Sequence, residues 1–176
     1  VSSESLWNEI YDKLNAQCPS TQEELQWLLG MKITDTTNES GERTVEISQE
    51  PKITALLEQI GMTDCNTCKT PLPCTAALPD ASDCPTTEEE ERAITAKTSH
   101  STYSAFRTEF REIIGYLSHL CEYGRPDLMQ SVHYLARFQA HPGMAHYTCV
   151  KRIARYCKDT KNMSMIFGND KHPYNK

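Results

Sequence analysis

Apolar residues at helical spacing fill residues 104 to 161, and this pattern constrains the fold more than any other feature of the chain. Two short interruptions, at 124–126 and 141–143, contain Gly and Pro, which end one helix and begin the next. Helices joined by such short links pack as antiparallel neighbours, so we expect a three-helix bundle. The residues expected to face its core are Phe106, Phe110, Ile113, Leu117, Leu120, Leu128, Val132, Leu135, Phe138, His146, Val150, Ile153 and Cys157.

The N-terminal part has a different pattern, which predicts two strands between two helices. A short amphipathic helix is expected over residues 3 to 14. Residues 27 to 33 and 43 to 48 alternate apolar and polar side chains, and a turn-rich loop from about 35 to 42 joins them into an antiparallel hairpin. A helix that begins with Pro and ends with Gly follows over residues 51 to 61. The predicted fold class is therefore α+β and mostly helical: a β-hairpin near the N-terminus followed by an antiparallel helix bundle.

Residues 63 to 103 show neither the apolar spacing of a helix nor the alternation of a strand. Four prolines recur in it, and "TTEEEER" adds four consecutive glutamates, Glu88 to Glu91. We expect an irregular connector that is mobile in part, with the glutamates as a solvated acidic run.

Charge is distributed unevenly along the chain. Residues 1 to 100 hold 7 Lys and Arg against 18 Asp and Glu, whereas residues 101 to 176 hold 11 against 6. A basic row on the third helix, in which Lys151, Arg155 and Lys158 share one face, can follow nucleic-acid phosphates. The alternative interpretation is an ordinary solvated helix face. The candidate nucleic-acid-binding residues are Arg137, Lys151, Arg152, Arg155, Lys158 and Lys161.

Eight cysteines raise the question of disulfides or a metal site. Cys65 and Cys68 form one half of a structural zinc site, but Cys74 and Cys84 do not supply the second half. We therefore expect reduced thiols and no metal in this chain, with zinc binding by Cys65 and Cys68 as an alternative. No Gly-rich phosphate loop, nucleophile elbow or catalytic triad occurs, so the residues alone indicate no active site.

Four segments occur together in one order: "LQWLLGMKI", "EISQEPKITALLEQIGMTDCNTCKTPL", "FREIIGYLSHLCEYGRPDL" and "HYTCVKRIARYCKDT". This series resembles the reverse transcriptase region of copia-type (Ty1/copia) retrotransposon polyproteins. The resemblance covers most of residues 25 to 160. It implies a fragment of an RNA-directed DNA polymerase, with the remainder of the polyprotein and an RNA/DNA template–primer duplex as partners. It also implies an intracellular location, either cytoplasmic in a virus-like particle or nuclear, and no membrane partner.

The resemblance divides the chain into parts of a polymerase. Residues 1–49 would be the end of the palm, and residues 50–62 the first thumb helix. Residues 63–103 would be the connector, residues 104–161 a thumb-like three-helix bundle, and residues 162–176 a tail toward a ribonuclease H region. The segment that would support the primer consists of Trp27, Leu28, Leu29, Gly30, Met31 and Lys32.

Catalysis is not expected from this chain alone. The family's metal-binding aspartates would lie upstream of Val1, and no adjacent pair of aspartates occurs in the sequence. Two-metal phosphoryl transfer needs such carboxylates, so Mg²⁺ is implied for the parent polymerase and no cofactor for this chain. The alternative function is a non-catalytic helical binding module, or a domesticated relic, with a protein partner.

Overall fold

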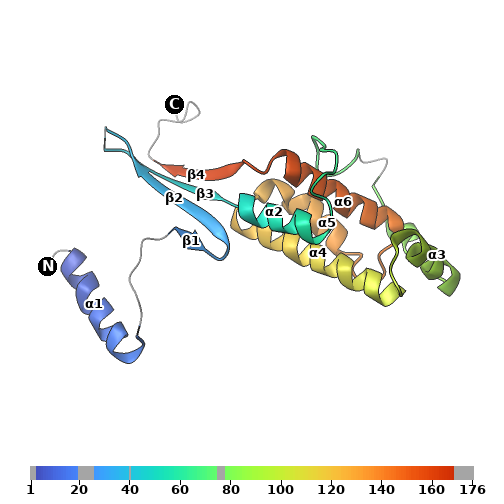
Figure 1. Cartoon of the computed structure of the whole chain (residues 1–176), viewed down its shortest axis with the longest axis horizontal. Coiled ribbons are helices and arrows are strands. Elements are labelled where there is room, and N and C mark those ends of the chain that lie inside the picture. Colours follow the sequence, from blue (N-terminus) through green and yellow to red (C-terminus); the bar gives the residue numbers. More distant parts are fainter. Residues whose placement is uncertain (1–2, 20–25, 40, 75–77, 169–176) are drawn as a thin grey trace.

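A computed structural model describes residues 3–19, 26–39, 41–74 and 78–168 of the chain. It confirms a mostly helical α+β fold, in which a small antiparallel sheet adjoins a bundle of helices (Figure 1). Within these residues, no helix combines the length and the apolar character that crossing a lipid bilayer requires.

The bundle consists of helices whose apolar faces meet in one core. Helix α4 (Tyr103–Tyr123), the short η3–α5 unit (Pro126–Leu128 and Met129–Ala136) and α6 (Met144–Asp159) run antiparallel to their chain neighbours, as predicted (Figure 1). Helix α2 (Glu50–Gln59) joins them and contributes its own buried residues to the same core. Every residue predicted to face the core is buried except Phe138, which is half-buried.

The sheet has more strands than the predicted hairpin. Its order is β1-β2-β3-β4, formed by Trp27–Leu28, Met31–Thr37, Arg43–Ser48 and Ser164–Gly168, and all neighbours are antiparallel. Within the segment assigned to a tail, residues 162–176, β4 returns to pair with β3. Residues 169–176 lie outside the described residues.

One face of the sheet is apolar and only partly covered. Ile33, Ile47 and Met165 pair across β2, β3 and β4, so their side chains lie on the same face. All three are half-buried, and Phe167, which is two positions from Met165 and therefore on the same face, is 50% exposed. Met31, at the end of the sheet next to α2, is buried. Cover from the bundle thus decreases along the sheet with distance from α2.

The predicted irregular connector, residues 63–103, contains two helical elements: a 3₁₀ turn at Ala81–Asp83 (η2) and helix α3 at Glu88–Thr98. Glu88 to Glu91 form the first turn of α3, so the expected irregular conformation is wrong there, although Glu88, Glu89 and Glu90 are exposed, as predicted for a solvated run. Thr87 caps this helix: its hydroxyl accepts the Glu90 N–H at 3.3 Å, and the Glu90 carboxylate accepts the Thr87 N–H at 3.2 Å. Acidic residues at this end are favoured because the helix dipole is positive there.

The connector also packs closely onto the bundle. A side-chain Cβ at Gly143 would lie 1.8 Å from the Asp83 carbonyl oxygen, so only glycine fits where η2 meets the start of α6. The Gly143 N–H donates to Nδ1 of His146 at 3.0 Å, which caps α6 from inside the core.

Helix α1 (Ser3–Gln17) differs from the other helices, because it lies apart from the bundle (Figure 1). Its apolar residues Leu6, Ile10 and Leu14 stand at a spacing of four, as predicted, yet each is 43–57% exposed. The helix forms the expected amphipathic stripe, but the described residues do not bury it.

Candidate nucleic-acid interface

Helix α6 holds four of the six predicted nucleic-acid-binding cations. Lys151, Arg152, Arg155 and Lys158 are all half-buried, because their stems lie along the helix and against neighbouring segments. The hydrophobic residues of α6 face the opposite way, into the core. The apolar spacing of the sequence therefore fixes which face of α6 carries the charge.

The segment 65–70 lies along this basic face and binds two of its cations. The Lys158 ammonium donates to the Cys65 carbonyl at 2.7 Å. The Arg152 guanidinium donates to the carbonyl and the hydroxyl of Thr70, at 3.2 and 2.8 Å. The Cys68 thiol donates to the Arg152 carbonyl at 3.2 Å, which ties the same segment to the helix backbone. The Lys158 and Arg152 side chains thus hold part of the connector in addition to carrying charge.

Two further cations of the predicted set rest on aromatic rings. The Lys151 ammonium lies 4.5 Å from the centroid of the Tyr147 ring. The Arg137 guanidinium lies 4.3 Å from the Tyr134 ring centroid and 5.4 Å from that of Phe138. A cation over a ring keeps its full charge and is held in a defined position. Arg155 has neither a hydrogen bond nor an ion pair within the described residues.

Lys161, the sixth predicted cation, does not belong to this face. It follows α6 and lies 3.2 Å from the carboxylate of Glu50, at the start of α2. Asp159, the acid near the end of α6, is paired with Lys69 at 2.9 Å. Hydrogen bonds from Lys69 and Thr67, together with the charge of Lys69, lower the pKa of Asp159, so this acid is matched by Lys69 rather than by the cations of α6.

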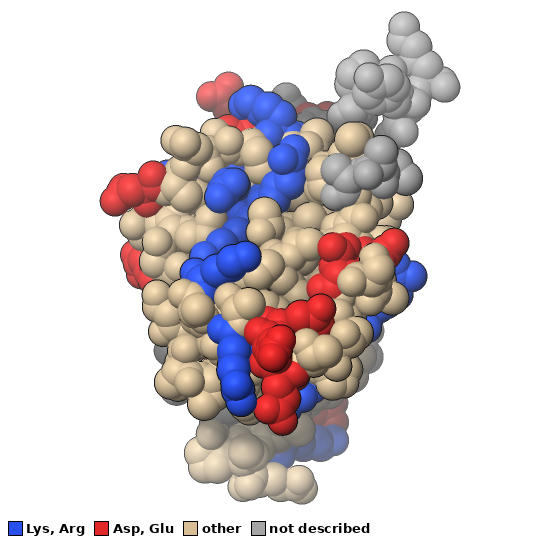
Figure 2. Space-filling view, turned by 90° about the vertical axis from the view of Figure 1, so that its right-hand side faces the viewer, with Lys and Arg blue, Asp and Glu red and all other residues tan. Residues whose placement is uncertain are grey.

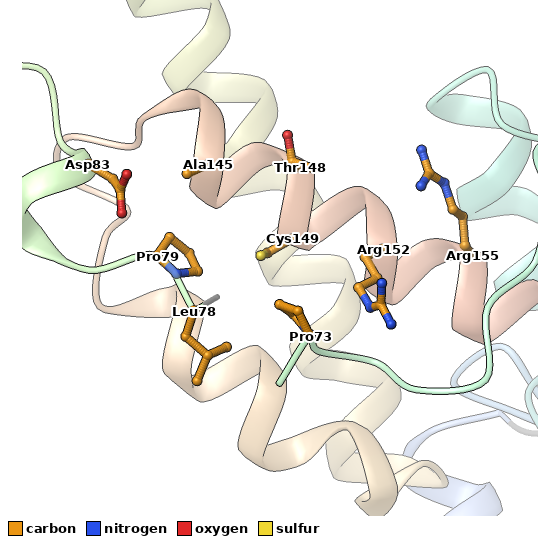
Figure 3. Close-up of a pocket in the computed structure, with 9 residues that line it drawn as sticks. All are labelled: Pro73, Leu78, Pro79, Asp83, Ala145, Thr148, Cys149, Arg152 and Arg155. Carbon is orange, nitrogen blue, oxygen red and sulfur yellow. The ribbon is translucent and has the colours of Figure 1, made fainter. Parts of the chain in front are cut away.

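A pocket of about 470 Å³ opens beside the basic face, between α6 and the connector (Figure 3). Pro73, Leu78 and Pro79 form its apolar wall. Arg152 and Arg155 lie toward one end and Asp83 toward the other (Figure 3). Charge of opposite sign at the two ends makes the pocket less suited to a polyanion than the open face of α6.

The distribution of charge over the surface agrees with a basic strip. Figure 2 shows Lys and Arg side chains in a band that runs down one face of the molecule, with Asp and Glu gathered beside it. Such a strip next to acidic groups can orient a polyanion along the band.

The predicted primer-supporting residues form a tight hairpin rather than one continuous strand. Trp27 pairs with Lys32 and Leu28 with Met31, so Leu29 and Gly30 are the turn residues. Both have positive φ, 51° and 81°, as a type I′ turn requires. The prediction of one continuous strand through residues 27 to 33 is therefore wrong. The permissive backbone of Gly30 allows the chain to reverse there.

This hairpin exposes large apolar side chains. Trp27, Leu28 and Leu29 are 55%, 45% and 58% exposed, and Lys32 is exposed as well, whereas Met31 is buried. The structure thus brings five of the six predicted residues to an exposed tip and places one under it.

Comparison with known proteins relates the chain to one class. It is 33% identical over 143 residues to the retrovirus-related Pol polyprotein from transposon TNT 1-94 of Nicotiana tabacum. The chain is related to a retrotransposon Pol polyprotein. The matched region covers 81% of the chain, and it spans 10% of that polyprotein. No family model matches the chain, and no solved structure matches it.

The relation supports the copia-type origin that the sequence motifs indicate. The assignment of this Pol-related chain to a thumb, and its binding of a template–primer, remain predictions. Among the described residues, no group of three or more His, Cys, Asp and Glu side chains could hold a metal ion. All eight cysteines are free, and Cys121, Cys149 and Cys157 are buried as small core residues.

Arg125 is a buried charged residue whose role the sequence does not reveal, and it is 2% exposed. Its guanidinium forms a two-pronged ion pair with Asp127 at 2.8 and 2.9 Å and donates to Thr160 at 2.7 Å. Burial opposes ionisation of Asp127, but the bonds and charge of Arg125 outweigh it and lower the pKa of this carboxyl. The motif Arg-Pro-Asp was visible as part of the resemblance, yet only the structure shows that it ties η3 to the end of α6.

Proposed function

We propose that this chain contributes template–primer binding to the RNA-directed DNA polymerase of a retrotransposon Pol polyprotein. In this proposal the open face of α6 contacts nucleic-acid phosphates, and the catalytic aspartates with their Mg²⁺ belong to another part of the polyprotein. The observation that carries the proposal is that three of the four cations of α6 are held by neutral groups, and that none of the four is paired with a carboxylate within the described residues. The relation to a Pol polyprotein supports it.

The neutral partners matter because they position the cations without cancelling their charge. Lys158 and Arg152 bind carbonyl and hydroxyl oxygens, and Lys151 rests on a ring. An Arg or Lys paired with a carboxylate would lose most of its attraction for a phosphate. Here the positive field persists, so each phosphate contact can release condensed counterions from the nucleic acid.

The remainder of the polyprotein is the second partner in this proposal. The stripe of α1 and the apolar face of the sheet leave large side chains exposed, including Trp7 at 53% and Phe167 at 50%. Extended apolar exposure of this kind marks protein interfaces. The same observation favours the alternative function, a helical module that binds a protein and no nucleic acid.

A salt titration distinguishes the two functions. The double variant Lys151→Gln with Arg155→Gln keeps good helix formers and leaves the bonds to segment 65–70 in place. We expect it to bind an RNA/DNA hybrid more weakly, and to flatten the slope of log K against log salt by about two units. The measurement is fluorescence anisotropy of a labelled duplex at several salt concentrations.

The matched control removes the same charge elsewhere. Lys13 and Lys97 are exposed on α1 and α3, so Lys13→Gln with Lys97→Gln changes the net charge equally without touching α6. We expect this control to retain the parent slope. Equal slopes for the parent and the α6 variant would refute the interface, and salt-independent or absent binding by the parent would favour the protein-binding alternative.

A further inference from the structure

Lys52 connects the exposed hairpin tip to the helix bundle. Its ammonium lies 3.4 Å from the Leu29 carbonyl, at the turn, and 2.9 Å from Nε2 of His119 on α4. Its stem packs on the turn, since a Cβ at Gly30 would meet atoms of Lys52 at 3.6 to 4.0 Å. One side chain of α2 thus reaches both the turn and α4.

The turn has little else to hold its shape. Strand β1 is two residues long, so two residue pairs flank the turn. Leu29 adopts positive φ, a conformation that non-glycine residues rarely take and that costs free energy. A short hairpin of this kind is marginal alone, so an external donor to the Leu29 carbonyl adds directly to its order.

The contact between Lys52 and His119 requires a neutral imidazole. An ammonium has only donors, so Nε2 must accept and the ring proton must lie on Nδ1. The groups that face His119 are Lys52 from α2 and Glu122 from α4, with the Tyr123 ring 4.6 Å away. Lys52 also lies 5.7 Å from the Tyr116 ring.

The environment keeps both groups in the states that the contact needs near neutral pH. Burial and then the charge of Lys52 lower the pKa of His119, against a smaller opposite effect of Glu122. Burial lowers the pKa of Lys52 as well, from an ordinary value of 10.5 that leaves the amine protonated. A depressed histidine pKa means that the neutral form is stable down to pH values below its ordinary 6.5.

We propose that Lys52 is a positioning residue for the hairpin tip, and that protonation of His119 releases it. A protonated His119 offers N–H instead of a lone pair and repels the ammonium, so Lys52 loses its anchor and the Leu29 carbonyl its donor. The turn is then ordered at neutral pH and loosened in acid. The consequence for primer support rests on the proposed function, whereas the contact itself does not.

Trp27 offers a direct reporter of the turn. Trp7→Phe leaves it as the single tryptophan of the chain, and its fluorescence anisotropy follows the order of the hairpin in the free protein. In this background we expect the anisotropy to fall as the pH is lowered from 8 to 5, with a midpoint below 6.5 because the pKa of His119 is depressed. Helical circular dichroism should stay constant over the same range.

Three variants separate positioning from simple stability. Lys52→Met fills the same space without a donor, so we expect low anisotropy at every pH. Lys52→Arg restores a donor and should recover the parent value at pH 8. His119→Gln keeps an acceptor that does not titrate, so the anisotropy should stay high and lose its pH dependence.

Two results would overturn the proposal: parent-like anisotropy in Lys52→Met at pH 8, or an unchanged acid transition in His119→Gln. Duplex binding is measured separately on the same proteins. A confirmed acid transition without any duplex binding would leave the positioning role intact and refute the proposed function alone.

Discussion

The helix bundle encloses most of its apolar residues, whereas the sheet and α1 expose theirs. Ile153 on α6 is fully buried, and Ile166 on β4 is 65% exposed. Ion pairs follow the same division: the Arg125 side chain is 2% exposed in the bundle, and the Arg43 side chain is 70% exposed in the sheet. The bundle therefore buries its own core, whereas the sheet and α1 carry apolar side chains that the described residues leave exposed.

The difference bears on function because the two parts would serve different partners. A self-contained bundle can present the basic face of α6 as a fixed surface, which suits recognition of a regular phosphate backbone. An uncovered sheet and helix suit a protein partner that completes their core. The following predictions test this division, in order of decreasing effect.

The largest effect should come from a matched pair of truncations. Ile153→Ala removes fully buried methyl groups and leaves a cavity, so we expect the free energy of unfolding to fall by about 4 kcal/mol. Ile166→Ala removes exposed atoms and should change it by about 0.5 kcal/mol or less. Urea unfolding measures both. A similar loss at the two positions would mean that β4 is as well packed as the core.

A second pair compares ion pairs. Asp127→Ala leaves the buried Arg125 charge unmatched, which costs 3–5 kcal/mol at full burial; because the Asp127 side chain is 30% exposed, we expect about 2–3 kcal/mol. Asp35→Ala breaks the exposed pair with Arg43 in the sheet and should leave the unfolding midpoint almost unchanged. A similar loss of stability at Asp35 and Asp127 would mean that the ion pair in the sheet contributes as much to stability as the one in the bundle.

The smallest effect concerns the helix cap of α3. Thr87→Ala removes the acceptor for the Glu90 N–H, so we expect a loss of about 1 kcal/mol. Thr87→Ser retains a hydroxyl and serves as the control, with most of the stability kept. Equally slow amide exchange in α3 of both variants would show that the Thr87 hydroxyl does not stabilise the start of this helix.

The bundle could be predicted from sequence because its signals are local and repeated. Gly124, Pro126 and Pro142-Gly143 mark the helix ends, and apolar spacing defines the buried face. Helix α3 was within reach too, since Thr87 and Glu90 form a capping box whose spacing is readable. The run of four glutamates favours a solvated, irregular segment instead, because like charges repel one another in a helix.

The rest depended on contacts between distant segments. The strand at 164–168 has five residues and no partner nearby in sequence, so its pairing with β3 could not be read locally. For the candidate interface, the sequence predicts that cations share one face of α6. It does not predict that Cys65 and Thr70 bind two of these cations. The contact between Lys52 and His119 could not be predicted either, because the two residues are 67 positions apart.

The pairing of β3 with β4 also has a consequence for folding. The bundle is inserted between these adjacent strands, and Ser164 of β4, whose hydroxyl donates to the Glu46 carboxylate of β3, lies 118 positions further along the chain. Such non-local contacts form slowly, because the entropy of loop closure is lost before the strands gain their hydrogen bonds. We therefore expect the helices to collapse first and to bring α2 and the end of α6 together, where Lys161 meets Glu50. Until β4 has been synthesised and has docked, the edge of β3 stays open, and a nascent chain is exposed to pairing with its neighbours on the ribosome.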